Sequence, residues 1–264
     1  MARKAKTPKW LQAAREAGKA GVVKEKPDWL ARALSRAGVM PLADAEAAIG
    51  AGRVRVGGKT VREPFAPVRD GERVHVDGGE VSLQAPLWVL AFHKPAGIVT
   101  SAVDPQGQGT VFDALHTALS PDLRRYGWHA VGRLDRDTTG LLLFTNDERL
   151  VAHVTSPSTH LPKRYIARVS GKADDAKLEP LRQGLVLDDG AARPARAILR
   201  APDVVELTLT EGRHHQVKRM LGKVGLPVLA LHREAIGGVE LDIPLGSYRP
   251  LRAEEIREGL RFVA

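Results

Sequence analysis

Apolar residues in the first well-patterned part of the chain recur at helical spacing. Over residues 29–37 they return every three or four positions, behind Asp28 and in front of Gly38. This period predicts a helix with Asp28 as its N-cap and Gly38 as its end. A second short helix is predicted over Leu42–Ile49, where a glycine again follows the last apolar position.

The period then changes to two, which is typical of strands. Residues 53–61 alternate apolar and polar side chains around Gly57–Gly58, a pair that favours a two-residue hairpin turn. One further strand is predicted over Glu72–Val76. Two helices and a small sheet thus form a module over residues 28–79, and residues 80–86 follow it as a linker.

Strands and helices in the remaining residues, 87–264, alternate without a regular repeat. Strands are predicted over Trp88–Phe92, Gly140–Thr145, Arg164–Val169 and Val204–Thr210, and helices over Val111–Leu119 and His214–Val224. This irregular order is typical of an α+β domain with a mixed, largely antiparallel sheet. We therefore expect two domains of unequal size.

Composition excludes several classes of site. The 264 residues include no cysteine, so disulfides, thiolate zinc sites and thiol nucleophiles are ruled out. The longest apolar runs, such as Trp88–Phe92 and Leu226–Leu231, are far too short to cross a bilayer. We expect a soluble cytoplasmic protein without a membrane partner.

Positive charge is concentrated at the start of the chain. Residues 1–26 hold eight Lys or Arg against two acids, which accounts for most of the formal net charge of +9. A basic, flexible tail over residues 1–27 is the expectation. Such tails commonly bind nucleic acid through phosphates, but they also serve as solubilising extensions, and charge alone leaves both readings open.

A pair of carboxylates in the second domain is the first candidate for chemistry. Asp135 and Asp137 stand just before the apolar run Leu141–Phe144. A calcium loop that began at Asp135 would need a glutamate at its twelfth position, where Asn146 stands. The histidines show no metal-ligand spacing either, so no metal site is expected. A turn that launches a buried strand explains Asp137 but leaves Asp135 without a purpose.

Four segments of the second domain, in this order, resemble the active-site motifs of pseudouridine synthases. They are His93–Gly97, Gly132–Leu141, Lys163–Tyr165 and Glu211–Met220. The residues in these motifs are most similar to those of the ribosomal small-subunit pseudouridine synthase A family. Relatives that act on large-subunit RNA usually carry arginine where Lys218 stands.

The first module resembles the S-four RNA-binding domain, a small module named after a ribosomal protein. The matching segments are Leu34–Gly38, Asp44–Glu46 and Gly52–Lys59. That family usually has a Ser-Arg pair before its second helix, whereas this chain has Met40–Ala43 there. The departure removes one expected basic contact to RNA.

The resemblance implies an isomerase that cuts the glycosidic bond of a uridine, turns the base and rejoins it through carbon, without a metal or organic cofactor. It assigns Asp135 as the carboxylate that acts covalently on the nucleotide and Lys218 as the cation that keeps it ionised. It makes Tyr165 the aromatic face for the flipped base, although strand periodicity alone favours a core tyrosine. Arg133 is expected to enter the vacated stack or to hold a phosphate, with an ion pair to Asp137 as the alternative.

The resemblance also implies that the chain acts as a monomer on ribosomal RNA or a pre-ribosomal particle, most closely on 16S small-subunit rRNA. The alternatives are 23S large-subunit rRNA and a non-catalytic rRNA-binding assembly factor. Basic residues expected to contact RNA are Arg36, Arg53, Arg55, Lys163, Arg164, Arg213, His214, His215, Arg219 and Arg233.

Overall fold

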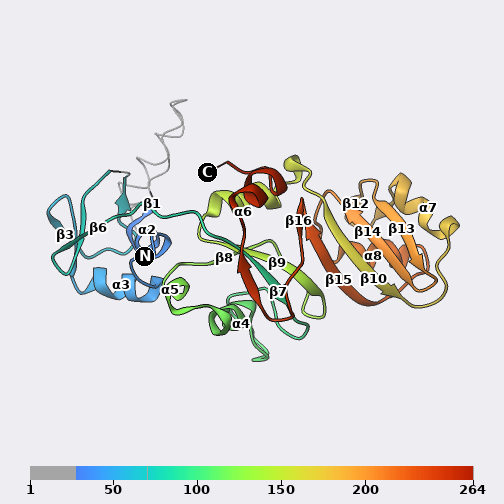
Figure 1. The fold of residues 1–264 in the computed structure, drawn as a ribbon, viewed down its shortest axis with the longest axis horizontal. Helices are drawn as coiled ribbons and strands as arrows, with labels where there is room; N and C mark the ends of the chain where they lie inside the picture. The colour runs from blue at the N-terminus through green and yellow to red at the C-terminus, as the bar shows by residue number, and fades with distance from the viewer. Residues whose placement is uncertain (1–27, 70, 264) are drawn as a thin grey trace, which may run out of the picture.

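The structure is a computed structural model, and it describes residues 28–69 and 71–263. The basic tail expected over residues 1–27 lies outside this range. A small N-terminal module lies at one end of an elongated molecule, and a larger domain built on one long sheet forms the rest (Figure 1). Within the described residues, no helix combines the length and the apolar character needed to span a bilayer.

The N-terminal module packs two helices against two antiparallel hairpins. Its elements are β1 (Asp28–Trp29), α2 (Leu30–Arg36), α3 (Leu42–Gly50), β2 (Val54–Val56), β3 (Lys59–Val61), β4 (Pro67–Val68), β5 (Val74–Val76) and β6 (Gly79–Val81). Leu30, Leu34 and Ile49 are fully buried against Val54 and Val74 of the four-stranded sheet β3-β2-β5-β6. The apolar positions that recur at helical spacing in the sequence are the ones that form this core.

Two details of the module differ from the expectations. The N-cap of α2 is Trp29, because Asp28 belongs to β1, which pairs with β4, and its carboxylate binds the Arg36 guanidinium at 3.2 Å. The stretch expected as a linker begins inside a strand, since β6 pairs with β5 over residues 79–81.

A nine-stranded sheet organises the second domain. Its main path runs in the order β13-β14-β10-β15-β9-β7-β17, with β16 on β15 and β8 on β9. The strands are β7 (Val89–Lys94), β8 (His129–Val131), β9 (Thr139–Thr145), β10 (Lys163–Val169), β13 (Arg196–Ala201), β14 (Val204–Leu209), β15 (Val228–Ile236), β16 (Val239–Glu240) and β17 (Tyr248–Pro250). Every pairing recorded in this sheet is antiparallel except that of β9 with β15, so the fold is α+β as expected.

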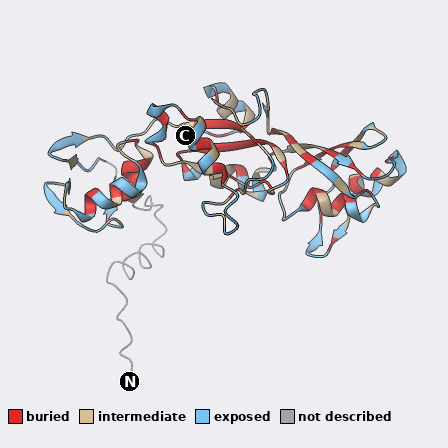
Figure 2. Ribbon diagram, turned by 90° about the horizontal axis from the view of Figure 1, so that it is seen from below, coloured by how far each residue is buried: buried red, intermediate tan, exposed pale blue. Residues whose placement is uncertain are grey.

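Helices cover both faces of the sheet, which explains why its central strands are continuously apolar. In β9, Leu141 and Leu143 pack with α6 (Glu148–Thr155), whereas Leu142 and Phe144 pack with α4 (Val111–Ala118). The strand alternates its side chains between the two faces, and Figure 2 shows the resulting buried centre.

The half of the sheet around β10, β13 and β14 has a core of its own. Helices α7 (Asp175–Gln183) and α8 (Gln216–Lys223) contribute buried leucines and Met220 to it. The apolar face of α8 lies in this core, because Val217, Met220 and Leu221 are buried. Short elements complete the domain: α5 (Pro121–Arg124), β11 (Val186–Leu187), β12 (Gly190–Ala191) and two helical turns at Pro157–Thr159 and Glu255–Gly259.

The two halves of the sheet meet where β9 runs parallel to β15. Only two residue pairs join the strands, Thr139 with His232 and Gly140 with Arg233. Gly140 has φ of +114°, and a Cβ atom there would lie 2.3 Å from the carbonyl oxygen of Arg233. Only glycine permits this approach. The loop that carries Asp135 enters the sheet at this junction.

Candidate active site

A buried lysine holds the loop before β9. Lys94 ends strand β7 and is fully buried. Its ammonium group donates to the carbonyl oxygens of Pro95, Asp135, Arg136 and Thr138 at 2.9–3.2 Å. Burial lowers the pKa of Lys94 to about 8, although the nearby carboxylates of Asp137 and Asp135 oppose that shift. One buried cation therefore fixes the backbone at Asp135 and over the residues that follow it, up to Thr138.

Two further buried side chains fix the same loop. The Thr100 hydroxyl donates to the Leu134 carbonyl at 2.8 Å and lies 3.2 Å from the Leu134 amide. Arg233 on β15, 3% exposed, donates from Nε to the Leu141 carbonyl at 2.7 Å and from Nη1 to the Arg133 carbonyl at 3.4 Å. Its Nη2 has no protein partner within the described residues. The loop is thus tied to both halves of the sheet.

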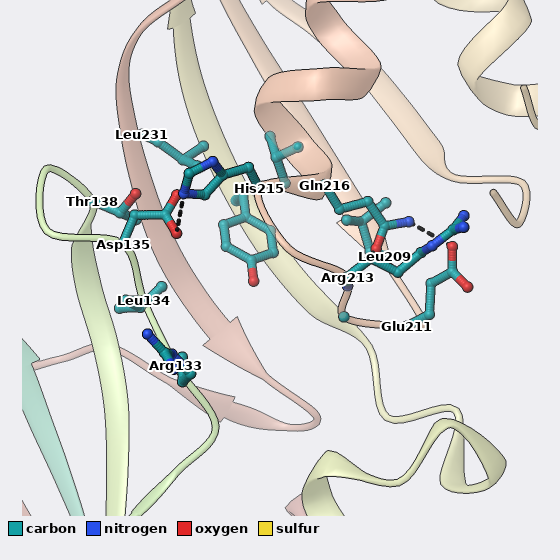
Figure 3. A pocket seen from close by; sticks show the side chains of 13 residues that line it. Arg133, Leu134, Asp135, Thr138, Leu209, Glu211, Arg213, His215, Gln216 and Leu231 are labelled. Atoms are coloured by element: carbon teal, nitrogen blue, oxygen red, sulfur yellow. Dashed lines mark hydrogen bonds and ion pairs between the residues drawn. The ribbon is translucent and has the colours of Figure 1, made fainter. Parts of the chain in front are cut away.

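The side chain of Asp135 leaves this loop toward helix α8 (Figure 3). One carboxylate oxygen lies 3.3 Å from Nε2 of His215, and the other lies 3.1 Å from Nζ of Lys218. His215 is the N-cap of α8 and has φ of +50°, a left-handed conformation that is uncommon outside glycine. The structure therefore brings Asp135 and Lys218 together, as the sequence predicts, and adds His215 to the carboxylate.

Lys218 also binds Asp137, at 2.6 and 2.8 Å. Burial lowers the pKa of Lys218, but hydrogen bonds to Asp137 and Asp135 outweigh it, so the pKa lies above its usual range. The same hydrogen bond from Lys218 holds the pKa of Asp137 below its usual range. Lys218 is therefore charged at neutral pH and is shared by two carboxylates.

Tyr165 lines the same pocket as Asp135. It comes from β10, between β14 and β15, and packs partly against the apolar cores on both sides of the junction. Its hydroxyl lies 3.4 Å from Nη1 of Arg233, whose guanidinium carbon is 5.9 Å from the ring centroid. The two readings of Tyr165 are compatible, since one ring serves both core and pocket. The other lining residues are Arg133, Leu134, Thr138, Leu209, Glu211, Gly212, Arg213, His215, Gln216, Val217 and Leu231.

Arg133 lies exposed at the rim of this pocket. Its carbonyl group is held by Arg233, but its guanidinium forms no recorded hydrogen bond or ion pair with the residues that the structure describes. Among the described residues, the ion pairs of Asp137 include Lys218 and not Arg133. The guanidinium is therefore available to a ligand.

Comparison with known proteins shows the family of the chain. Residues 88–223 match the family model described as RNA pseudouridylate synthase. The chain belongs to the RNA pseudouridylate synthase family. It is a pseudouridine synthase, and hence an enzyme.

Relatives and a solved structure agree with this assignment. The chain is 39% identical over 217 residues to ribosomal small subunit pseudouridine synthase A of Pseudomonas aeruginosa, covering 81% of this chain and 92% of the relative. It is 37% identical over 233 residues to ribosomal large subunit pseudouridine synthase B of Escherichia coli K12, covering 84% and 78%. A crystal structure described as pseudouridylate synthase matches with a TM-score of 0.60 and 28% identity, covering 87% of this chain and 98% of that one.

Several basic residues of this synthase that were expected to contact RNA are engaged within the protein. Arg36 pairs with Asp28, Arg53 with Asp77, Arg164 with Glu234 and Glu240, and Arg213 and Arg219 with Asp189. Hydrogen bonds from Arg219 lower the pKa of Asp189 to about 2. These arginines support local structure, whatever further contacts they make.

The other residues expected to contact RNA differ in how far their side chains are exposed. Arg55 is exposed, and His214 stacks on His215 with ring centroids 3.7 Å apart. Lys163 is half-buried, with its ammonium on the Leu161 carbonyl at 3.1 Å. Arg233 differs from the others, because it is 3% exposed and its guanidinium holds the active-site loop.

Lys94 is the site residue that the sequence analysis missed. It lies inside the motif His93–Gly97, which marked the family, but no role was inferred for it. The available signal was a lysine two residues after the apolar run 89–92, where a charge is costly without dedicated partners. No cluster of three metal-ligating side chains occurs in the residues that the structure describes.

Proposed function

We propose that this pseudouridine synthase isomerises a uridine of ribosomal RNA, most closely one of small-subunit 16S rRNA. The observation that carries the catalytic assignment is the contact of Asp135 with both Lys218 and His215 at the mouth of the Tyr165 pocket. The relative named for the small subunit is covered over 92% of its length and the one named for the large subunit over 78%. This difference, together with lysine at position 218, favours the small subunit.

In this proposal Asp135 is the group that reacts with the nucleotide. Its carboxylate forms a covalent bond to the nucleotide, the bond between the ribose carbon and N1 of uracil breaks, and the base turns within the pocket. The bond between Asp135 and the nucleotide then breaks as carbon 5 bonds to the ribose carbon. Carbon 5 loses a proton and N1 gains one, so the free carboxylate is regenerated and the reaction is redox-neutral. Lys218 offsets the negative charge of this carboxylate through their 3.1 Å ion pair.

Tyr165 and Arg133 act on the base and on its former place in the RNA. Taking a base out of the stack costs a few kcal/mol, and an aromatic face that receives it returns about 1–3 kcal/mol. The Tyr165 ring is suited to that role, and its hydroxyl is suited to assist the loss of the proton from carbon 5. The unpaired guanidinium of Arg133 fills the vacated stack or holds a phosphate.

The chain acts as a monomer on rRNA or on a pre-ribosomal particle in this proposal. An rRNA substrate agrees with the cytoplasmic localisation expected from the sequence. The N-terminal module, which resembles the S-four domain, supplies further RNA contacts, with exposed Arg55 as the candidate that is free of ion pairs among the described residues.

Site-resolved mapping of pseudouridine in both rRNAs tests the proposal. A strain that lacks the protein should lose pseudouridine at one position of 16S rRNA, and expression of the wild type should restore it, whereas Asp135→Asn should not. Loss at a 23S position would support the large-subunit alternative. Full modification by Asp135→Asn would refute the assignment of Asp135 as the catalytic group.

A further inference from the structure

A second hollow of the surface lies next to the active site and has no role in the chemistry proposed above. It has a volume of about 780 Å³, within the range of about 300–1,000 Å³ that is common for ligand sites. Its lining residues come from both domains. They are Leu42, Thr100, Ser101, Ala102, Phe112, Trp128, His129, Ala130, Gly132, Arg133, Glu148, Val151 and Ala152, and we call this hollow the Trp128 groove.

The Trp128 groove and the active-site pocket share one lining residue. Arg133 lines both hollows, and Asp135 is only two residues further along the chain. Two residues span at most about 7 Å, so an occupant of the groove is a close neighbour of a nucleotide at Asp135. Arg133 is exposed and its guanidinium has no recorded partner among the described residues, which favours an anionic, phosphate-linked ligand.

The walls of the groove are suited to a flat heterocycle. The Trp128 indole donates its N–H to the Leu123 carbonyl at 2.9 Å, so its polar edge is satisfied inside the protein and the groove meets a partly exposed ring. Phe112 and Ala130 add further apolar surface. Strand β8, which carries Ala130, has a strand partner on one edge only within the described residues.

The polar groups of the groove do not conflict with such a ligand. Burial lowers the pKa of His129, so the imidazole is neutral near pH 7 and offers one donor and one acceptor, as a base edge requires. The one acidic group, Glu148, is paired with Arg32 at 3.3 Å and lies 3.9 Å from His129. Its charge is therefore partly offset by a neighbouring guanidinium.

We propose that the Trp128 groove binds the unpaired base of a nucleotide next to the target uridine, stacked on Trp128, while Arg133 contacts the phosphate between the two nucleotides. The inference rests on the proposed function, since it needs an RNA substrate. It assigns the groove a part in selecting the RNA, because a target whose neighbour stays paired would leave the groove empty. Stacking of one base on an aromatic ring changes affinity by about tenfold.

A bulky side chain introduced at the rim of the Trp128 groove tests the proposed base binding without disturbing the hydrophobic core. Ala152 is exposed on α6, and Ala152→Trp places an indole in the groove. The dissociation constant for the shortest RNA that the wild type modifies should rise about tenfold, while the single-turnover rate at saturating RNA stays within about twofold. The matched control is Ala176→Trp, an exposed alanine of α7 that lines neither hollow, and it should bind as the wild type does.

An abasic scan of the same RNA identifies the occupant. At one position beside the target, removal of the base should weaken wild-type binding about tenfold and should not weaken binding by Ala152→Trp any further, since both changes remove one contact. Trp128→Leu should behave like Ala152→Trp, and Trp128→Phe should retain most of the affinity. Unchanged binding by Ala152→Trp, or additive effects at every position, would overturn the proposal.

Two other outcomes separate the groove from the catalytic proposal. A defect of Ala152→Trp that appears only with protein-containing particles would assign the groove to a ribosomal protein and overturn the base-binding role. Absence of isomerisation by the wild type would refute the proposed function, whereas the groove is judged by RNA affinity and by the abasic scan.

Discussion

Lys218 and Asp135 form a 3.1 Å ion pair that joins helix α8 to the loop before β9. The same ammonium group lies closer to Asp137, at 2.6 Å, but the two carboxylates differ in exposure. The Asp137 side chain is 71% exposed and that of Asp135 is 25% exposed. Water screens the pair with Asp137, so of the two aspartates only Asp135 is a partly desolvated anion. This difference separates two aspartates that look equivalent in the sequence.

Substitution of each aspartate by asparagine should separate their roles. Asp135→Asn should lower the single-turnover rate by at least about 10⁴-fold, because it removes the proposed nucleophile. Asp137→Asn should keep the rate within about tenfold, since Lys218 remains with Asp135. Its free energy of unfolding should change by less than about 1 kcal/mol, as expected for an exposed pair. Equal losses of rate in the two variants would contradict this division.

Loss of the shared cation should affect catalysis more than folding. Lys218→Ala leaves Asp135 with His215 as its remaining contact, and we expect the single-turnover rate to fall about 10²–10³-fold while RNA affinity changes little. Lys218→Arg keeps the charge and should retain part of the rate. The control is Lys223→Ala in the same helix, whose half-exposed ammonium lies 4.0 Å from Asp188. A control as inactive as Lys218→Ala would point to loss of the helix rather than of the cation.

The buried ammonium of Lys94 should make stability depend on pH. Its pKa is about 8 in the folded protein and 10.5 as a free side chain, because burial disfavours the charge. Between these values the unfolded chain holds more protons, so the free energy of unfolding rises with pH, by at most about 1.4 kcal/mol per pH unit. Urea titrations from pH 7.5 to 10.5 should show this rise for the wild type relative to Lys94→Met. If the free energy of unfolding of the wild type fell with pH relative to that of Lys94→Met, the lowered pKa of Lys94 would be contradicted.

The same substitution should expose the role of Lys94 in the loop. Lys94→Met removes the donor from four carbonyl groups, and we expect a loss of about 2–4 kcal/mol in the free energy of unfolding near pH 7. The activity of the folded fraction should fall as well, because the Asp135 backbone is no longer fixed. Full activity in a stable Lys94→Met protein would show that other contacts suffice.

The sequence predicted those elements whose pattern is local. The run Leu141–Phe144 reads as a strand because both of its faces are buried, and the glycine pair at 57–58 marks a hairpin through its own backbone freedom. Strand β15 was missed although it is central, because Val228–Ile236 mixes apolar residues with His232, Arg233 and Glu234. Those polar side chains are accommodated by long-range partners that no local period reveals.

The sequence predicted those site residues that the family motif names. It did not predict residues that act by positioning other residues. Asp135 and Lys218 were paired from the motif, and the structure brings them together. The roles of Lys94 and Arg233 depend on carbonyl groups of a loop that lies elsewhere in the sequence. His215 was expected to touch RNA, and its contact with Asp135 follows from the left-handed turn that begins α8.

The close contact of β9 with β15 predicts that glycine is required at position 140. Gly140→Ala would place a Cβ atom 2.3 Å from a backbone oxygen at a φ of +114°, so we expect a loss of at least about 2 kcal/mol in the free energy of unfolding. Gly222→Ala, within helix α8 and without neighbours within 4 Å, should instead stabilise by about 0.5–1 kcal/mol. Urea denaturation of both variants is the measurement. If both substitutions changed the free energy of unfolding equally, the contact of β9 with β15 would not require glycine at position 140.

The unpaired guanidinium of Arg133 should appear in the salt dependence of RNA binding. If Arg133 contacts a phosphate, Arg133→Ala should weaken binding at low salt and lower the slope of log affinity against log salt by about 0.7–1. Arg257→Ala is a matched control, because Arg257 is exposed and paired only with Glu258 in the ion pairs recorded here. It should change neither the slope nor the rate. Arg133→Lys separates the two roles of Arg133. If Arg133 fills the stack that the uridine leaves, this variant should have the wild-type salt slope but a lower rate. If Arg133 only contacts a phosphate, the variant should have both the wild-type slope and the wild-type rate.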